Sequence, residues 1–415
     1  MPEAVGTPEV ALRSVAALLL PADPDRHGTI LEADERWHFD PHAVPGGVDR
    51  VVWGRTALPG RTPRAQALRS AAAREVAIRR LRRHPPSPLR VVAVHRLPPP
   101  ALHVGAPYAL RAAVLGGALV EFATTTGCPT VLDAVASAAG AAAGVEGFRP
   151  GSGGVGLARV TLGDGSRGLI RAAPAGGPGD PVHAADALSV LASAGVPKVP
   201  RLLGHGIAAG ASWVAESALD GARPRTVSAA LFAEVAGLVS SWPRRQGPPA
   251  ALDDDLGAIA AVLPDRSDLL AAARARLDRA IASLPAVLRH GDLWAGNLLV
   301  RRGALAGVVD WDAWHPSAVP GADLVQLHGT EFRIRTHASL GQAWLAHPWR
   351  SGFAEATAGY WRSLGVEPTA AVLDAAAAAW WAAEAAGTLR RLPHRSRDPD
   401  WITTNIDLVL RAMTS

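Results

Sequence analysis

The first third of the chain alternates short apolar runs with polar breaks, as an α/β unit does. The runs at 48–58 and 89–97 are rich in valine and bounded by polar or turn residues, and both predict strands. Between them, the pattern around 63–83 predicts a helix, which ends at the paired prolines of HPPSP because proline cannot continue it. A further apolar element follows at 108–123. We therefore expect an α/β domain over residues 1–147.

A glycine- and alanine-rich segment at 138–147 marks the expected end of that domain. Two alternating runs then flank Asp164-Gly165, a dipeptide that favours the tight turn of a β-hairpin. The segment 180–195 predicts a helix with Asp180 as its cap and Pro181 at its first position. Two short strands are expected next, in VPKVPRLLGHG and SWVAESALDG. These elements predict a β-rich lobe over 148–222.

From about Ser228 the pattern becomes mostly helical, which predicts a helical lobe over 223–415. One polar stretch interrupts it, LRHGDLWAGNLLVRRGALAGVVDWD at 288–312. Two short runs on either side of Gly303 predict a hairpin within this stretch. That hairpin would bring Asp310 back beside Asn297.

Composition narrows the functional classes. Of 415 residues, 48% are hydrophobic and 19% are charged, which is typical of a folded globular protein. The net charge is +5, and nearly all the positive charges are arginines, since Lys198 is the only lysine. We attribute this preference for arginine to genome composition. The charge therefore gives no reason to expect a nucleic-acid partner. Cys128 is the only cysteine, which excludes an internal disulfide and favours a reducing cytoplasm. The apolar runs are too short or too interrupted to span a bilayer, so we expect a cytoplasmic protein without a membrane partner.

The polar stretch holds two acids and one amide in an apolar frame: Asp292, Asn297 and Asp310. A carboxylate and an amide oxygen side by side are hard ligands that suit Mg²⁺ holding nucleotide phosphates. Asp292, five residues before the amide, would lie where a substrate hydroxyl can give up its proton.

The string HGDLWAGN fits the pattern H-G-D-x-x-x-x-N, and VVDWD follows at the matching distance. Over about residues 148–415 the chain closely resembles the aminoglycoside phosphotransferase family. The resemblance implies a bilobal protein-kinase-like fold of the α+β type, with a small β-rich N-lobe and a helical C-lobe, here preceded by the additional α/β domain. It implies ATP and Mg²⁺ as cofactors.

The same resemblance assigns roles to single residues. Asp292 corresponds to the catalytic base, and Asn297 and Asp310 correspond to the Mg²⁺ ligands. His290 would brace the catalytic loop without reacting. Asp323, in PGADLVQL, resembles a later structural aspartate of the family, although the residues around it differ.

Upstream, residues 151–156 read GSGGVG, a literal G-x-G-x-x-G. Such a string can open a dinucleotide-binding helix, but the alternating residues after it predict a hairpin, which is the kinase arrangement. The backbone amides of Ser152, Gly153, Gly154 and Gly156 are then the expected phosphate donors. A flexible linker stays open as an alternative, because glycine is abundant throughout the chain.

Two positions depart from the family. Arg171 stands where a lysine would bind the α- and β-phosphates, and Ala184 lies near the place of that lysine's partner glutamate. Asp186 is close in sequence but is expected on another helix face. The strand SWVAESALDG resembles the hinge that would bind adenine through backbone groups near Glu216 to Ala218.

The resemblance implies an ATP- and Mg²⁺-dependent phosphotransferase that acts on a hydroxyl of a small molecule of the amino sugar, aminoglycoside or amino alcohol type. The alternative, motivated by Arg171 and Ala184, is a catalytically silent kinase-like module that serves as a binding or regulatory scaffold. Homo-oligomer formation is left open. Four aromatic residues, Tyr360, Trp361, Trp380 and Trp381, would either line an acceptor pocket with Glu384 or form the core.

Overall fold

The computed structural model describes residues 137–138, 142–150, 156–174, 180–208, 211–350 and 352–415, and upstream of these the strands β1 to β6. By its internal contacts the chain divides into two compact units. The first comprises Met1–Ala185 and Arg201–Ala218, and the second comprises Asp186–Pro200 and Leu219–Ser415.

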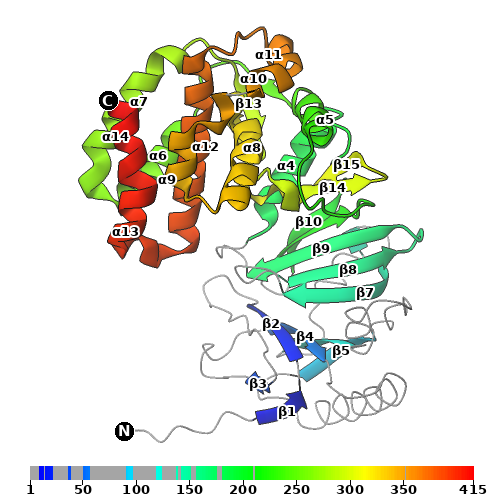
Figure 1. The fold of residues 1–415 in the computed structure, drawn as a ribbon. Helices are drawn as coiled ribbons and strands as arrows, with labels where there is room; N and C mark the ends of the chain where they lie inside the picture. The colour runs from blue at the N-terminus through cyan, green and yellow to red at the C-terminus, as the bar shows by residue number, and fades with distance from the viewer. Residues whose placement is uncertain are drawn as a thin grey trace, which may run out of the picture. The chain divides into compact units, whose positions relative to one another are not determined.

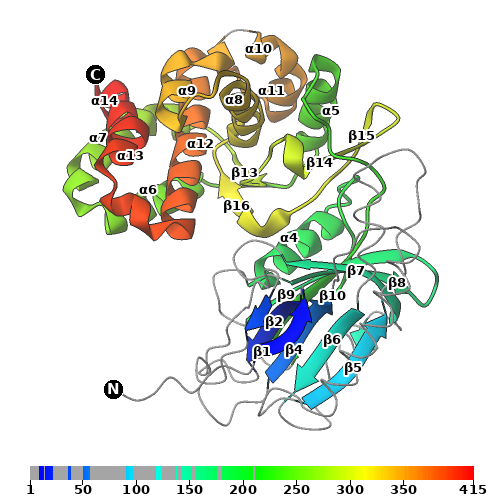
Figure 2. The ribbon, with the colours of Figure 1, turned by 60° about the horizontal axis from the view of Figure 1, so that its bottom comes forward.

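The described strands in the upstream part of the first unit form two antiparallel sheets. β1 pairs with β3, while β2, β4, β6 and β5 form a four-stranded sheet in that order (Figure 2). The strands predicted at 48–58 and 89–97 are present as β4 and β5, and the apolar element at 108–123 ends in β6. The helix predicted around 63–83 lies outside the described residues. The bounds are β1 (Glu9–Arg13), β2 (Val15–Pro21), β3 (Arg36–His38), β4 (Arg50–Thr56), β5 (Arg90–Arg96) and β6 (Ala118–Ala123).

The first unit also contains a five-stranded antiparallel sheet with strand order β10-β11-β9-β8-β7, of which Figure 1 labels β7 to β10. The predicted hairpin at Asp164-Gly165 is confirmed as the turn between β8 and β9, where Gly165 has a φ of 79°. The Asp164 carboxylate accepts a hydrogen bond from the Ser166 backbone amide at 2.9 Å, which closes this turn. The bounds are β7 (Ala142–Pro150), β8 (Gly156–Leu162), β9 (Arg167–Pro174), β10 (Leu202–Ala208) and β11 (Ala211–Ser217).

The strand β7 runs through the place where the sequence suggested a domain boundary. Its residues pair with β8, from Ala142 opposite Leu162 to Pro150 opposite Gly156. Residues 142–147 therefore belong to the five-stranded sheet and do not form a linker. The division into three domains at 147 and 222 stays a prediction.

The helix predicted at 180–195 is present as α4 (Val182–Ser193). Asp180 caps it, because its carboxylate accepts a hydrogen bond from the Val182 amide at 3.0 Å. The second carboxylate oxygen of Asp180 accepts from the Ser212 hydroxyl at 2.9 Å, which ties the start of the helix to β11.

The second unit is helical, as the sequence predicted from Ser228 onward. Figure 1 shows the long helix α12 beside α6 and α8, against which it packs. Within the described residues no helix has the combination of length and hydrophobicity that crossing a membrane requires. The bounds are α5 (Ala229–Val239), α6 (Ala251–Val262), α7 (Ser267–Ile281), α8 (Ala322–Thr336), α9 (Leu340–Ala346), α10 (Phe353–Ala356), α11 (Ala358–Leu364), α12 (Ala370–Arg391), α13 (Pro399–Ile402) and α14 (Leu408–Thr414).

Short strands and turns connect these helices. They are β12 (Arg244–Arg245), β13 (Ala286–Arg289), β14 (Leu298–Arg301), β15 (Ala304–Val308), β16 (His315–Ala318), η2 (Pro264–Arg266), η3 (Ala295–Asn297), η4 (Trp311–Ala313), η5 (Pro348–Arg350), η6 (Pro393–Arg397) and η7 (Thr403–Asp407). The strands β12, β13 and β16 pair with one another, and β14 pairs with β15.

The core of the helical unit contains the aromatic residues that the sequence offered for an acceptor pocket. Tyr360, Trp361, Trp380 and Trp381 are all buried. The indole N–H of Trp381 donates to the backbone carbonyl of Asn405 at 2.7 Å, and that of Trp361 donates to the Thr357 hydroxyl at 2.9 Å. Of the two alternatives for these four residues, the structure therefore supports the core, because their burial leaves almost no surface for an acceptor.

Candidate active site

The predicted polar stretch forms a loop and a hairpin within the second unit. All four residues of β13 are buried, and the chain leaves this strand at His290. The hairpin is confirmed: Leu298 pairs with Val308 and Arg301 pairs with Ala304. The Val309 amide then donates to the Asn297 carbonyl at 3.0 Å, so the backbone of the VVDWD segment lies beside Asn297, as the sequence suggested.

Asn297 holds the carboxylate of Asp292. The side-chain nitrogen of Asn297 donates to the Asp292 backbone carbonyl and to Asp292 Oδ2, both at 2.8 Å. Both partners are acceptors only, so the orientation of the amide is fixed and its oxygen Oδ1 faces away from them. Asn297 is buried, whereas Asp292 is half-buried. The amide thus orients the expected base and keeps an oxygen ligand for a cation.

Asp310 follows β15 in the left-handed region, with φ 73° and ψ 63°. Aspartate tolerates this region better than most residues, and here it lets the chain turn sharply into η4. Trp311 anchors the turn: its side chain is buried, and its indole N–H donates to the Val308 carbonyl at 3.1 Å. The Asp310 side chain is exposed.

Asn297 and Asp310 suit Mg²⁺ by their chemistry, since amide and carboxylate oxygens are the ligands that this ion prefers. Magnesium usually takes one or two such ligands and completes its shell with water and substrate phosphates. Among the described residues, no three His, Cys, Asp or Glu side chains gather where they could share a metal ion.

His290 braces the loop from inside, as predicted. Its ring is completely buried, Nε2 lies 3.1 Å from the Val309 carbonyl, and Nδ1 accepts from the Asp292 amide at 3.2 Å. This pair of partners requires a hydrogen on Nε2 and none on Nδ1. Burial lowers the pKa of His290, which acts in the same direction as these partners and favours the neutral ring. The ring thus connects the backbone at Asp292 with the backbone at Val309.

Asp323, near the start of α8, fulfils the structural role that the resemblance implied. One carboxylate oxygen accepts from the His290 amide at 2.7 Å and the other accepts from the Gly291 amide at 2.9 Å. Burial raises the pKa of this carboxyl, while the hydrogen bonds from the two backbone amides act in the opposite direction. The side chain fixes the backbone that leads into Asp292.

Gln326 is a further residue at this loop, and the sequence reasoning missed it. It lies one turn after Asp323 on α8, is buried, and contacts residues on both sides of Asp292. The sequence did hold one sign of it: Gln326 follows Asp323 by three residues, and this spacing places both side chains on the same face of a helix.

In the first unit, Arg171 forms an ion pair that the sequence also did not reveal. Its guanidinium lies 3.3 Å from the carboxylate of Glu216, and both side chains are about 3% exposed. Arg171 pairs with Val214 across β9 and β11, so Glu216, two residues further along, projects from the same face of the sheet. Ala184, near the expected place of the partner glutamate, is buried. The carboxylate partner of Arg171 thus comes from a strand.

The other expected nucleotide contacts are only partly described. Ser152, Gly153 and Gly154 lie outside the described residues, and Gly156 begins β8. The Ala218 amide donates to the Arg167 carbonyl at 2.8 Å within the sheet. Contacts of Glu216 and Ala218 with adenine stay predictions.

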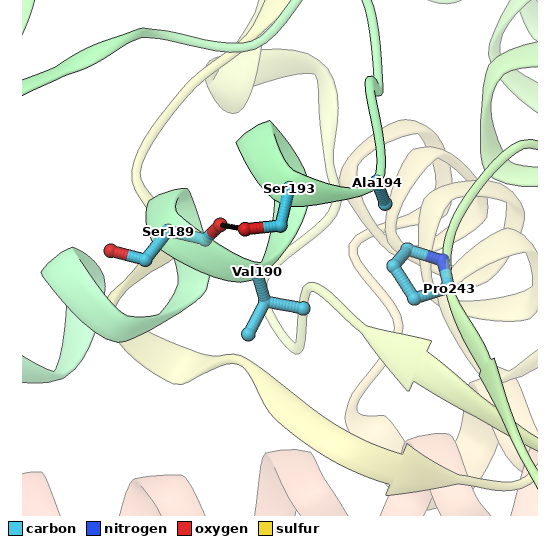
Figure 3. A pocket seen from close by; sticks show the side chains of 5 residues that line it. All are labelled: Ser189, Val190, Ser193, Ala194 and Pro243. Carbon is cyan, nitrogen blue, oxygen red and sulfur yellow. Dashed lines mark hydrogen bonds between the residues drawn. The ribbon is translucent and has the colours of Figure 1, made fainter.

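A shallow hollow of about 430 Å³ lies elsewhere in the second unit, lined by Ser189, Val190, Ser193, Ala194 and Pro243 (Figure 3). The Ser193 hydroxyl donates to the Ser189 carbonyl at 2.8 Å. The hollow contains neither a carboxylate nor an amide side chain, and Asp292, Asn297 and Asp310 do not line it. It offers no chemistry that competes with the polar loop.

Several solved structures resemble this one. They include the aminoglycoside phosphotransferase APH(3'')-Id from Streptomyces rimosus in complex with ADP and streptomycin, which is 20% identical, covers 57% of this chain and 92% of its own, and has a TM-score of 0.39. A proposed fructosamine-3-kinase from Haemophilus somnus is 14% identical, covers 69% and 97%, and has a TM-score of 0.48. An aminoglycoside phosphotransferase from Alicyclobacillus acidocaldarius is 14% identical, covers 70% and 96%, and has a TM-score of 0.40.

Comparison with curated proteins gives no significant match. The model of the phosphotransferase enzyme family, in contrast, matches residues 147–357, which include β8 to β11 and the whole polar loop. The sheet of the first unit and the helices of the second agree with the β-rich and helical lobes that the sequence predicted. The match to the family model covers half of the chain and shows that the chain belongs to the phosphotransferase enzyme family.

Proposed function

We propose that this phosphotransferase moves the γ-phosphate of ATP, in the presence of Mg²⁺, to a hydroxyl group of a small molecule. The observation that carries the proposal is the contact between Asn297 and Asp292, in which one amide orients the base and keeps its oxygen for a cation. Membership of the family makes the chain a small-molecule kinase. The acceptor class that we propose is amino sugars, aminoglycosides and amino alcohols.

Each residue of the polar loop has a separate task. Asp292 accepts the proton of the acceptor hydroxyl, and the Asn297 amide holds its carboxylate in place for that transfer. His290 stays neutral and keeps the Asp292 and Val309 backbones together. Asn297 Oδ1 and the Asp310 carboxylate would hold Mg²⁺, which when bound neutralises charge on the phosphates.

The Arg171–Glu216 pair supports nucleotide binding by this chain in spite of its departures from the family. A buried guanidinium needs a carboxylate partner, and Glu216 supplies the one that Ala184 cannot. We propose that Arg171 binds the α- and β-phosphates and that the amides of residues 151–156 bind phosphate oxygens. The pair weighs against a catalytically silent module, because it supplies the carboxylate partner whose absence at Ala184 had motivated that alternative.

The test is a comparison of wild type with Asp292→Asn. We expect wild type to bind ATP in calorimetric titration only when Mg²⁺ is present, and to release ADP with at least one acceptor of the proposed class. Asp292→Asn should lose roughly 10²- to 10⁴-fold in kcat and bind Mg·ATP nearly as before, because it removes only the proton acceptor. Removing Mg²⁺ with a chelator should abolish both binding and turnover.

Asp268→Asn on α7 is the matched control, since this aspartate is exposed and has no part in the loop. Its turnover should equal that of wild type. Wild-type turnover in Asp292→Asn would refute the assignment of the base. An absence of nucleotide binding at millimolar ATP with Mg²⁺ would refute the proposed function itself.

A further inference from the structure

The backbone on either side of Asp292 is held by one side chain of α8. The Leu293 amide donates to Gln326 Oε1 at 2.9 Å, and Gln326 Nε2 donates to the Gly291 carbonyl at 3.2 Å. These two backbone groups are the immediate neighbours of Asp292 in sequence. A single amide thus spans the residue that accepts the proton.

A carboxylate on α12 fixes the orientation of this amide. Gln326 Nε2 also donates to Glu384 Oε1 at 2.8 Å. An ionised carboxylate only accepts hydrogen bonds, so the nitrogen of Gln326 must face Glu384 and its oxygen must face Leu293. The opposite orientation would bring two oxygens together and leave the buried Leu293 amide without its acceptor.

Glu384 is half-buried on the face of α12 that packs against α8. Its contact with Gln326 is a hydrogen bond between residues 58 positions apart in sequence. Through Glu384 and Gln326, the 22-residue helix α12 is connected to the loop that carries Asp292.

We propose that Gln326 is a positioning residue for Asp292 and that Glu384 acts through it by fixing the orientation of its amide. This inference rests on the proposed function, in which Asp292 is the catalytic base. Asp323 holds the amides of His290 and Gly291, before Asp292, whereas Gln326 holds the Leu293 amide after it and the carbonyl before it. Asp323 and Gln326 therefore bind different backbone groups of the same loop.

The first experiment measures kcat, KM for ATP and the affinity for Mg·ATP in Gln326→Met. Methionine has nearly the same volume but makes none of the three hydrogen bonds. We expect kcat to fall roughly 10- to 100-fold, because a small displacement of a catalytic group has effects of that size. KM for ATP and the affinity for Mg·ATP should change by a smaller factor than kcat does, because the variant leaves Asn297 and Asp310 in place.

Glu384 supplies the second variant and the test of coupling. Glu384→Ala should lower kcat roughly threefold to tenfold, as expected for one lost hydrogen bond, and should have no further effect in a Gln326→Met background. Glu384→Gln keeps an acceptor oxygen and should restore turnover to that of wild type. Additive effects in the double variant would overturn the role assigned to Glu384.

Hydrogen exchange of the Leu293 amide tests the inference without any reference to activity. In Gln326→Met this amide should lose protection, while the amides of α8 and α12 keep theirs. Unchanged exchange at Leu293 together with unchanged kcat would overturn the proposal. If wild type transfers no phosphate to any acceptor, the proposed function fails, but the exchange result still decides whether Gln326 holds the loop.

Gln342→Met is the matched control, because it removes another glutamine amide, in the capping box of α9, away from the loop. It should lower the midpoint of thermal unfolding slightly and leave both kcat and the exchange of Leu293 unchanged. A loss of kcat in this control equal to that in Gln326→Met would show a general structural effect and overturn the proposal.

Discussion

Gly291 stands between His290 and Asp292 with a φ of 80°, in the left-handed region. A Cβ atom at this position would lie 2.1 Å from the backbone carbonyl oxygen of Ala313. That oxygen belongs to the backbone of the turn that follows Asp310 and cannot rotate away as the end of a side chain could. The residue must be glycine for two reasons, its backbone conformation and the closeness of a second loop.

Gly291→Ala should therefore destabilise the protein by more than about 1 kcal/mol and lower kcat, since relief of the clash displaces Asp292 or Ala313. Urea unfolding and steady-state kinetics measure the two effects. Gly257→Ala is the control: this glycine is exposed within α6, a Cβ atom there would meet open space, and alanine should stabilise the helix by about 0.5–1 kcal/mol. Equal stability of Gly291→Ala and wild type would show that the two loops separate easily.

At the scale of elements, the ion pair between Arg171 on β9 and Glu216 on β11 connects neighbouring strands of the sheet. Both groups are nearly inaccessible to water, so each carries a large desolvation cost that the other offsets. Removing one partner leaves the other as a buried charge with less compensation.

Arg171→Met should lower the free energy of unfolding by roughly 3 kcal/mol or more, and should weaken ATP binding because the phosphate-binding cation is gone. The double variant Arg171→Met, Glu216→Met should recover most of the stability, since two apolar side chains replace the pair, but none of the ATP affinity. Chemical unfolding and calorimetry separate these outcomes. ATP affinity equal to wild type in both variants would exclude Arg171 from the nucleotide site.

Local elements could be predicted from the sequence because their causes are local. The Asp164-Gly165 hairpin, the Asp180 cap of α4 and the hairpin that joins Asn297 to Asp310 each depend on residues within a few positions of one another. Asp292 and His290 were found through a contiguous motif. The family match over residues 147–357 includes this motif.

Contacts between distant elements could not be predicted in the same way. Arg171 and Glu216 are 45 positions apart, and Gln326 and Glu384 are 58 apart, so their meeting depends on sheet register and helix packing. The sequence showed that Arg171 lacked the usual partner at Ala184 but not which strand would supply another. The sequence also left open whether Trp380 and Trp381 face a pocket or the core. Helical periodicity shows which residues share a face of the helix, but it does not show what that face contacts.

At the scale of the whole molecule, four histidines share one electrostatic property. Burial lowers the pKa of His290, His315, His328 and His347 below the ordinary value of 6.5. In the unfolded chain these rings regain their ordinary pKa, so between the folded values and 6.5 the unfolded state binds more protons. Their contribution to stability is present above pH 6.5 and is lost as the pH falls toward the folded values. The pKa of Asp323 shifts on folding in the opposite direction, because burial raises it.

We expect the free energy of unfolding to fall as the pH is lowered from about 7.5 to about 5.5, with a slope of about 1.4 kcal/mol per pH unit for each proton taken up. Urea unfolding across this range measures it. His328→Gln should reduce the slope, because it removes one of the rings whose pKa burial lowers. A free energy of unfolding that stays constant or rises as the pH falls would show that these histidines do not determine the pH dependence of stability.

The left-handed backbone of Asp310 has a consequence for the molecule as a whole. Glycine adopts this conformation without the steric cost of roughly 1 kcal/mol that a side chain with a Cβ atom incurs there. Selection for folding alone would therefore favour glycine at 310, whereas the proposed role of Asp310 as a Mg²⁺ ligand requires the carboxylate. Stability and the proposed activity thus favour different residues at this position, and a screen of variants for heat resistance should preferentially return proteins that have lost this aspartate and, with it, the proposed phosphate transfer.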